Sequence, residues 1–583
     1  MNNAAVSHSS VYPDIYVKNR HTLVFKLHTA RGDLRKCELI LFERTKPHII
    51  SVVVMEKFLE DGIYDHYKAE IAFEEVAKYQ KYYFVLYDGE EGCSYYSRWE
   101  ISKVLPKDGF FEFLYANESE IVQRPKWSIG QVYYQIFPDR FSRKGEEIYE
   151  KWGTKPSREN YMGGNIQGII SKLGYLEELG IDCIYLNPIF LGDFNHKYAT
   201  TDYFLVDPLF GNNEDLKELV KKAHRKNIKI ILDGVFNHTG VNFKAFQDIL
   251  QNQEKSKYKD WYYIKKYPIE IAEDAKNYEC VGDYGYMPKL NTANPSVREY
   301  ILSVMVYWIE KYNIDGWRLD VADEVDESVW LLARRFLKDK FPNIILLGET
   351  WGDGLRLMSG NQMDYIMNYV FRDAVRDFVA KGDIEGEQFA HRISSMLSHY
   401  PHEVNCGMFL PLDSHDTERF LYFCEGNLEK LKLAVLIQMM MIGSPSIYYG
   451  DEVGMTGGND PDCRRCMNWE NPNEELYHYY RKLINLRKNS PAIQFGSFAV
   501  KYAEGKGFAF VRSEGEEKIY VICNGGDTEL ELDIPVAREG TYIDIESKKK
   551  YLAERMLGDK DQGKIKVRLE KYQGIVIRRT NNE

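Results

Sequence analysis

Between about residue 128 and residue 493, eight short apolar runs alternate with segments whose apolar residues recur at helical spacing. Strands that alternate with helices form a parallel sheet, and eight such units close into a (β/α)8 barrel. We therefore expect an α/β fold whose central domain is a barrel of this kind. The expected strands are 132–137, 181–188, 228–233, 315–320, 343–349, 364–369, 406–413 and 445–450.

The expected helices lie between these runs. Their pattern is clearest at 166–180, 213–227 and 297–313, where apolar residues follow the period of an α-helix. The stretch at about 239–292, between the third and fourth expected strands, is longer than a crossover helix requires. We expect it to form an inserted subdomain that overhangs the barrel mouth.

Both ends of the chain show the period of β-strands instead. We expect an N-terminal β-sandwich at 1–122, the catalytic barrel at 123–493 and a C-terminal β-sandwich at 494–583. Residues 111–127 are interpreted as a connecting segment. The strands expected outside the barrel are 22–29, 37–42, 67–73 and 81–88 before it, and 507–513, 518–524, 529–535 and 574–579 after it.

The bulk composition limits the partners and the compartment. A formal net charge of −12 argues against nucleic acid or an anionic membrane as a partner. No apolar run approaches the length of a transmembrane helix, and the first residues lack the pattern of a secretory signal, so we expect a cytoplasmic enzyme. The only closely spaced cysteines, Cys463 and Cys466, lack a second pair or nearby histidines, so no metal site is expected there.

Three expected strands end in a carboxylate inside a polar cluster. The clusters GWRLD, LLGE and LDSHD end in Asp320, Glu349 and Asp416. Barrel enzymes carry their chemistry at the carboxyl ends of the strands. Cleavage of a glycosidic bond needs such a set, because one carboxyl group donates a proton while another attacks the anomeric carbon.

The residues around the carboxylates predict how the work is divided. Arg318 and Asp320 are two apart on a strand, so their side chains share one side, and the guanidinium is expected to keep Asp320 ionised as the nucleophile. Glu349 follows an apolar run, so burial is expected to raise its pKa and make it the proton donor. Asp416, beside His415, would stabilise the transition state.

Each of these residues also has a structural explanation. A single aspartate at a strand end is more often a helix N-cap, and an Arg–Asp pair is more often a structural ion pair. His238, which ends a fourth cluster that begins with Asp233, is compatible with a satisfied histidine beneath a loop. These explanations treat residues one at a time, whereas polar clusters at four strand ends favour an active site.

The clusters as a set resemble a known family. DGVFNH at 233–238, GWRLDVADE at 316–324, GETW at 348–351 and DSHD at 413–416 are similar to the four signature regions of the alpha-amylase family of glycoside hydrolases. MPKLN at 287–291 resembles the extra signature of the subfamily that holds cyclomaltodextrinase, neopullulanase and maltogenic amylase. The resemblance covers essentially the whole chain and implies the barrel with both flanking β-domains.

The resemblance also implies a role for each matching residue. Asp320 matches the nucleophile, Glu349 the general acid and base, and Asp416 the transition-state stabiliser of a double displacement with retention. Glu324 and Trp351 match residues on the acceptor side, and Asp460 and Arg464 match a pair on the donor side. The residues that match those binding the glucose at subsite −1 are His196, Tyr198, His238, Arg318 and His415.

The implied function is hydrolysis of α-1,4-glucosidic bonds in cyclodextrins, maltooligosaccharides and pullulan. An alternative is an α-glucanotransferase of the same family that mainly transfers glucosyl units, since Asp323 and Glu324 lie where that balance is set. A second alternative, a glucan-binding protein without catalysis, is disfavoured because all three carboxylates are present.

Two further expectations follow from the resemblance. Relatives often bind calcium in the loop after the first barrel strand, but here residues 140–160 supply few oxygen ligands and Asn165 stands where an aspartate is usual. No cofactor is therefore expected to be required. The N-terminal domain resembles one that packs over the active site of a second subunit, so a homodimer is expected.

Overall fold

The computed structural model describes the chain except residues 90–91, 122–123, 146–148, 273–276, 556–562 and 581–583. Its centre is a parallel sheet in the order β18-β17-β16-β15-β12-β11-β20-β19. A parallel bridge between Met367 and Phe409 joins the two edge strands, so the barrel closes. The expected (β/α)8 barrel is confirmed. Its strands are β11 (Tyr133–Ile136), β12 (Cys183–Leu186), β15 (Lys229–Gly234), β16 (Gly316–Leu319), β17 (Ile345–Gly348), β18 (Tyr365–Ile366), β19 (Phe409–Pro411) and β20 (Ser444–Tyr448).

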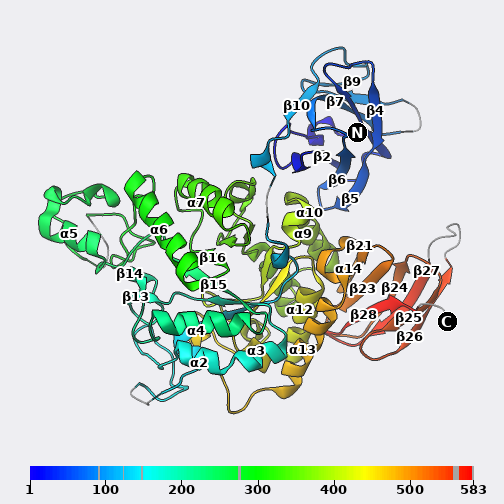
Figure 1. Cartoon of the computed structure of the whole chain (residues 1–583). Helices are drawn as coiled ribbons and strands as arrows, with labels where there is room; N and C mark the ends of the chain where they lie inside the picture. The colour runs from blue at the N-terminus through cyan, green and yellow to red at the C-terminus, as the bar shows by residue number, and fades with distance from the viewer. Residues whose placement is uncertain (90–91, 122–123, 146–148, 273–276, 556–562, 581–583) are drawn as a thin grey trace.

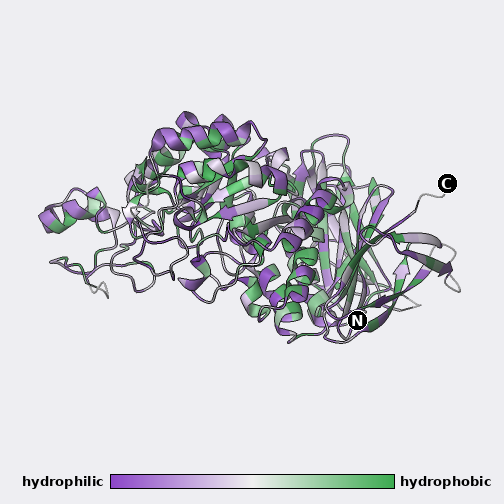
Figure 2. Cartoon of the chain, turned by 90° about the horizontal axis from the view of Figure 1, so that it is seen from below, coloured by the Kyte–Doolittle hydropathy of each residue, from purple (hydrophilic) through white to green (hydrophobic). Residues whose placement is uncertain are grey.

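Helices surround the barrel, and their outer faces are largely hydrophilic (Figure 2). None of the helices in the described part of the chain is long and apolar enough to cross a membrane. The helices are α1 (Pro138–Phe141), α2 (Ile166–Ser171), α3 (Leu173–Leu179), α4 (Asn213–His224), α5 (Lys244–Asn252), α6 (Pro295–Tyr312), α7 (Glu327–Lys340), α8 (Tyr369–Val375), α9 (Gly386–His399), α10 (His402–Asn405), α11 (Phe420–Phe423), α12 (Leu428–Met440), α13 (Glu474–Lys488) and α14 (Pro491–Phe495).

Alternate residues of the barrel strands serve two separate cores. Tyr133, Tyr185, Ile231 and Leu347 point inward and pack with one another inside the barrel. Their neighbours along each strand point outward and join the large core between the strands and the helices. The inward residues therefore fill the lower barrel and leave the carboxyl ends of the strands for polar side chains.

The N-terminal domain is a sandwich of two antiparallel sheets, as expected, and it lies beside the barrel in Figure 1. The interpretation of 111–127 as a connecting segment is wrong for Phe111–Tyr115, which forms β10 and pairs with β7. One sheet has the order β1 (Ile15–Asn19), β2 (Thr22–Ala30), β6 (Tyr64–Ala72) and β5 (Glu56–Glu60); the other contains β4 (Ile50–Val54), β3 (Lys36–Glu43), β7 (Lys78–Tyr87), β8 (Ser94–Tyr96) and β9 (Ile101–Ser102) besides β10.

The C-terminal strands form one antiparallel sheet that curls until β24 lies against β21, and the two faces of the curl enclose a core of their own. The predicted boundary at 122–123 lies outside the described residues, and α14 runs across the one at 493. The C-terminal strands are β21 (Ser497–Glu504), β22 (Gly507–Glu514), β23 (Glu517–Asn524), β24 (Leu530–Val536), β25 (Gly540–Asp544), β26 (Lys550–Arg555), β27 (Gly563–Leu569) and β28 (Gly574–Arg579).

Two long connections interrupt the helix–strand alternation. The hairpin of β13 (Phe190–Asp193) and β14 (Ala199–Val206) follows β12. The expected insert follows β15 and consists of α5 and short bridged segments; the α5 end of it projects from the barrel in Figure 1. One of these bridges pairs Lys289 with His238, so the returning end of the insert lies against the end of β15.

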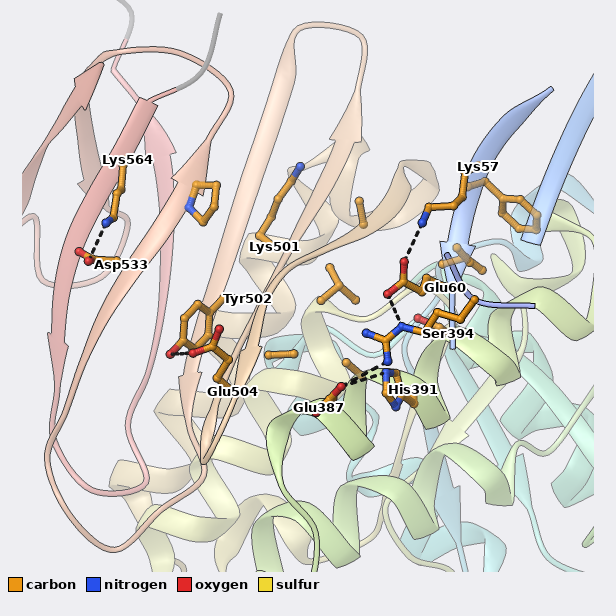
Figure 3. A pocket seen from close by; sticks show the side chains of 18 of the residues that line it. Lys57, Glu60, Glu387, His391, Ser394, Lys501, Tyr502, Glu504, Asp533 and Lys564 are labelled. Atoms are coloured by element: carbon orange, nitrogen blue, oxygen red, sulfur yellow. Dashed lines mark hydrogen bonds and ion pairs between the residues drawn. The ribbon is translucent and has the colours of Figure 1, made fainter. Parts of the chain in front are cut away.

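A groove of about 930 Å³ lies where the three domains meet, between β5, α9 and the C-terminal sheet (Figure 3). Its charged groups largely pair with one another. Arg31 binds Glu60 at 2.8 Å and Glu387 at 3.3 Å, and Lys564 binds Asp533 at 2.7 Å. Of these pairs, Arg31–Glu387 joins the N-terminal domain to the barrel, and the other two lie within one domain. Because these charges are already paired, the barrel mouth is the stronger candidate site.

Candidate active site

The register of the strands brings the polar clusters together. Asp233 on β15 lies opposite Arg318 on β16, and Leu319 lies opposite Gly348, which precedes Glu349. Because side chains alternate along a strand, Arg318 and Asp320 share the side that faces the barrel interior. Three neighbouring strands therefore direct their carboxylates at one point on the barrel axis.

The Arg318 guanidinium is completely buried at this point and binds three carboxylates. Its Nη1 donates hydrogen bonds to Asp233 Oδ1 at 2.9 Å and to Asp320 Oδ1 at 2.8 Å. Its Nη2 forms an ion pair with Glu349 Oε1 at 2.8 Å. The backbone N–H of Val321 donates to the other Glu349 oxygen at 2.9 Å. One cation thus holds the predicted nucleophile and the predicted acid close to each other.

The expectation that Arg318 would keep the pKa of Asp320 low is wrong for the free protein. Burial raises the pKa of Asp320 well above its ordinary value, and the charges of Glu349, Asp233 and Asp416 raise it further, which together outweigh Arg318. The physical reason is the ratio of charges, because a single guanidinium cannot neutralise three carboxylates in a site of low dielectric. The predicted effect of burial on Glu349 stays a prediction.

Asp416 is the most open of the three predicted catalytic carboxylates, with 30% of its side chain exposed. Its Oδ2 lies 3.2 Å from His415 Nε2, and its Oδ1 lies 3.5 Å from Arg464 Nη2. Loss of hydration among the surrounding protein atoms is the largest cause that raises the pKa of Asp416 to about 7, and the charge of Glu349 is the next. This carboxyl group therefore belongs to the same electrostatic cluster as Asp320.

His415 and Tyr198 form the wall next to Asp416. Their rings stack at 5.4 Å with 6° between the planes, and Tyr198 Oη lies 2.5 Å from His415 Nε2. The Tyr198 hydroxyl also donates to Asp233 Oδ2 at 2.9 Å. Burial and the charges of Arg464 and Arg318 lower the pKa of His415 well below its ordinary value, so the ring is neutral. Because Gln135 Nε2 donates to His415 Nδ1 at 2.8 Å, the proton of the neutral ring is on Nε2, which faces Tyr198 and Asp416.

Two further predicted histidines are neutral for the same reason. Burial lowers the pKa of both His196 and His238 to about 3. His196 Nδ1 accepts the backbone N–H of Tyr198 at 3.0 Å, which fixes its orientation. Neither ring nitrogen of His238 has a hydrogen-bond partner among the described residues, although the ring is buried. Polar atoms left open in this way are available to a ligand.

The predicted donor-side pair is joined to the site. Arg464 Nη1 binds Asp460 Oδ1 at 2.9 Å, and its Nε donates to the carbonyl oxygen of His415 at 2.8 Å. Arg158 reaches Asp460 from the loop after β11, at 3.2 Å. Arg464 is buried, so these contacts fix it beside Asp416 and connect the donor side with the catalytic cluster.

The predicted acceptor-side residues, Trp351 and Glu324, lie in the segments that follow β17 and β16. Trp351, half exposed, stacks face to face on Tyr369 at 4.1 Å with 2° between the rings. Glu324 Oε2 accepts a hydrogen bond from Asn237 Nδ2 at 3.0 Å and binds Lys289 Nζ at 3.1 Å. An exposed aromatic face and fixed polar groups are the features that bind sugar rings.

Several residues of the site were not predicted from the sequence as site residues. Asp233 binds Arg318, although the sequence had indicated only its strand end. Tyr185 donates to Asp233 at 2.7 Å, and Gln135 donates to His415 Nδ1 at 2.8 Å. These two lie inside the apolar strands β12 and β11. Both are polar residues at inward-facing positions of barrel strands, and this pattern could have indicated them from the sequence.

The loop at 140–160, where the sequence led us to consider calcium, contains several internal hydrogen-bond donors within its described residues (146–148 excepted). The Asn165 side-chain amide donates to the carbonyl oxygens of Lys144 at 2.9 Å and of Gly163 at 3.4 Å. Arg140 Nη2 donates to the carbonyl oxygen of Asn160 at 2.9 Å. Each N–H uses one of the two lone pairs of its carbonyl oxygen, which makes these oxygens poorer ligands for a hard cation. Independence from calcium stays a prediction.

Comparisons with known proteins agree with this geometry. Residues 135–496 match the model of the alpha amylase catalytic domain, and residues 1–117 match that of the alpha amylase N-terminal ig-like domain. A cyclomaltodextrinase of Geobacillus thermopakistaniensis (strain MAS1) is 40% identical over 93% of this chain and 94% of its own. Neopullulanase 2 of Thermoactinomyces vulgaris is 38% identical over 98% of this chain and 99% of its own. A solved cyclomaltodextrinase structure superposes with a TM-score of 0.92 at 34% identity, over 99% of this chain and all of that one.

Proposed function

The chain belongs to the alpha-amylase family of glycoside hydrolases, and from that premise we propose that it cleaves α-1,4-glucosidic bonds in cyclodextrins, maltooligosaccharides and pullulan. The observation that carries the proposal is that the Arg318 guanidinium forms ion pairs with both Asp320 and Glu349. Two carboxyl groups bound to one guanidinium lie close together. This favours the separation of about 5 Å found in retaining glycosidases over the wider separation found in inverting ones.

In the first step, Glu349 donates its proton to the glycosidic oxygen while Asp320 Oδ attacks the anomeric carbon. The carbon–oxygen bond to the leaving sugar breaks, and a β-glucosyl ester forms on Asp320. Burial and the neighbouring carboxylates raise the pKa of Asp320 in the free protein. The reaction requires Asp320 to be ionised and Glu349 to be protonated when the substrate is bound.

In the second step, the Glu349 carboxylate takes a proton from water while the water oxygen attacks the anomeric carbon of the glucosyl ester. Asp320 leaves as a carboxylate, and Glu349 is protonated again for the next cycle. Asp416, with His415 beside it at 3.2 Å, stabilises the positive charge of both transition states and orients sugar hydroxyls. Two inversions at one carbon give products that keep the α configuration.

The remaining predicted residues bind the substrate on both sides of the broken bond. His196, Tyr198 and His238 are neutral or uncharged groups that offer hydrogen bonds or a stacking face to the glucose whose bond breaks. Arg464 with Asp460 binds sugars on the donor side. Trp351 and Glu324 bind the leaving sugar and, later, the acceptor.

The test is to incubate the protein with β-cyclodextrin, pullulan and soluble starch side by side and to compare the products. The Asp320→Asn variant, purified in parallel, controls for contaminating activity. We expect maltooligosaccharide products whose α anomers appear first in proton NMR. First appearance of β anomers, or equal product formation by the variant, would contradict the mechanism.

The alternative is that transfer to another sugar dominates over hydrolysis. It is favoured by two observations at the predicted acceptor side: the fixed Glu324, and the half-exposed Trp351 ring that stacks on the buried Tyr369. Products from concentrated maltotriose separate the two functions. Chains longer than maltotriose indicate transfer, whereas glucose and maltose alone indicate hydrolysis.

We also propose a homodimer through the N-terminal domain. Strand β4 exposes Ile50, Val52 and Val54 by 57%, 59% and 58%, and residues two apart on a strand share one face. An apolar row of this kind indicates an interaction surface. Light scattering should show a dimer that Val52→Lys dissociates, while Leu552→Lys, on an equally exposed C-terminal residue, should leave it intact.

We also propose that the protein works in the cytoplasm and that its activity does not depend on calcium. All nine cysteines are free thiols and most are buried, which fits a reducing compartment. The amide of Asn165 uses carbonyl oxygens that calcium would need. No cofactor is therefore assigned to the reaction.

A further inference from the structure

We propose that Lys289, on the insert after β15, is a positioning residue that fixes Glu324 and thereby sets how well an acceptor sugar competes with water. The inference rests on the proposed function, because it assigns a task at the acceptor side of the same site. Lys289 does not touch the reacting atoms, so it acts through Glu324.

Lys289 is the centre of a small polar cluster. Its Nζ donates to Glu324 Oε2 at 3.1 Å, to the Glu324 carbonyl oxygen at 3.3 Å and to Asn237 Oδ1 at 2.5 Å. Asn237 Nδ2 closes the triangle by donating to the same Glu324 oxygen at 3.0 Å. Glu324 is therefore held at its carboxylate and at its backbone, from two directions.

The three residues come from three different segments that meet at the barrel mouth. Asn237 follows β15, Glu324 follows β16, and Lys289 is carried back to the barrel by the returning end of the insert. Backbone hydrogen bonds fix that return, with Leu290 N donating to Asn237 O at 3.0 Å and Thr239 N donating to Pro288 O at 3.1 Å. Because the backbone holds the segment, the Lys289 side chain is free to act on Glu324.

Burial shows which member of the pair controls the other. The Lys289 side chain is 19% exposed, whereas that of Glu324 is 48% exposed. A half-exposed glutamate without a partner samples many rotamers, and a sugar that binds to it must first order it. The ammonium of Lys289 removes that cost in advance and pairs with the charge of Glu324.

Lys289 also touches the other side of the reaction centre. Its backbone pairs with His238, whose ring nitrogens have no partner among the described residues. After burial, the charge of Lys289 is the next cause that lowers the pKa of His238. The same lysine therefore lies between the donor-side histidine and the acceptor-side glutamate.

The experiment compares transfer with hydrolysis in four variants that are made in the full chain. Lys289→Met removes the charge at similar length, Lys289→Arg keeps it, and Glu324→Gln removes the partner charge; the fourth variant combines Lys289→Met with Glu324→Gln. Lys257→Met is the matched control, since Lys257 belongs to the same insert and its ammonium packs 4.9 Å from the Tyr258 ring. Each protein is given maltotriose with and without excess glucose as acceptor.

We expect Lys289→Met to lower the ratio of transfer to hydrolysis about fivefold and to raise the acceptor KM, with a smaller change in kcat for hydrolysis, since a charged hydrogen bond at a partly exposed site is lost. Lys289→Arg should restore most of the ratio, and Lys257→Met should leave it unchanged. The double variant should equal Glu324→Gln, because Lys289 acts through that residue.

Two results would overturn the inference. One is an unchanged ratio in Lys289→Met, and the other is an effect that adds fully to that of Glu324→Gln. A loss of both products with a lowered melting temperature in Lys289→Met and Lys289→Arg would also count against it, since it would show a structural role. Failure of the wild-type protein to cleave maltotriose, β-cyclodextrin or pullulan would instead contradict the proposed function itself.

Discussion

The two ends of the barrel use aspartates in opposite ways. At the end where the strands begin, Asp182, Asp315 and Asp364 each accept a backbone N–H of a neighbouring strand or the segment leading into it, at 3.0, 2.9 and 2.8 Å. Each has cationic partners of its own. Asp364, for example, binds Arg334 at 2.9 Å and Lys338 at 2.7 Å. These carboxylates join strands to helices, and their charges are matched.

At the opposite end, the ratio of charges is reversed, since Asp233, Asp320 and Glu349 share the single guanidinium of Arg318. The pKa values record the difference. Burial raises the pKa of Asp364, but Arg334 and Lys338 outweigh it and the net shift is downward, whereas the pKa of Asp320 is raised well above its ordinary value. The comparison teaches that an aspartate at a barrel strand is structural where cations are sufficient and reactive where they are scarce.

The largest expected effect tests the crowded end. Asp320→Asn keeps the shape of the side chain but removes the nucleophile, so turnover of maltooligosaccharides should fall by about four orders of magnitude or more. Initial rates with maltotriose measure it, and circular dichroism checks the fold. A variant that keeps wild-type turnover would show that the cluster of carboxylates around Arg318 is not the catalytic site.

The next effect tests the matched end. Asp364→Asn leaves Arg334 and Lys338 without their shared carboxylate, and breaking a buried ion pair costs about 3–5 kcal/mol of unfolding free energy. Denaturant unfolding measures it, with turnover of the folded fraction unchanged. Asp373→Asn is the control, because Asp373 also binds two arginines but is 46% exposed, so its loss should cost less than about 1 kcal/mol. Equal losses in the two variants would remove the contrast.

A smaller effect concerns pH. The pKa of Asp416 in the folded protein is about 7, above its ordinary value of 3.8, so its contribution to stability is present at low pH and is lost as the pH rises through 7. Asp416→Asn removes that loss and should stabilise the protein at pH 8 by about 1–2 kcal/mol after solvent screening. The gain should disappear near pH 4. Thermal unfolding at both pH values measures it, and a gain that is independent of pH would disprove the assignment.

The smallest effect is an expected absence of change. If a bound cation balanced the charges of the mouth, a chelator would lower stability and activity together. Because donors such as Asn165 use the loop oxygens, EDTA should leave both the melting temperature and kcat within experimental error. Asn165→Asp, followed by added calcium, is the matched gain-of-site variant. A fall of several degrees in the wild-type melting temperature with EDTA would show that a cation had been overlooked.

The fold could be predicted from the sequence where burial is complete. The eight barrel strands are buried on both faces, so they read as continuous apolar runs and were found. The polar hairpin of β13 and β14 gave no such run and was missed. Strand β4 was also missed, although its residues are mostly apolar. β10 was taken for a connecting segment because it lies beside a long polar stretch.

The site could be predicted only in part. The sequence shows that Arg318 and Asp320 share one side of a strand, which correctly brought them together. It does not show that Asp233 and Glu349 arrive at the same guanidinium from two other strands, so the sign of the pKa shift of Asp320 was wrong. Tyr185 and Gln135 were missed because their partners lie on other strands.

The seam where the barrel closes has a consequence for motion. β18 is two residues long, and only the bridge of Met367 to Phe409 joins it to β19 within the described residues. A junction with so few backbone hydrogen bonds opens by local fluctuation more readily than any other pair of strands in the ring, so its amides should exchange with deuterium first. Tyr369, two residues past the bridge, carries Trp351 on its face, so each such opening would tilt the aromatic stack from which a cleaved sugar departs.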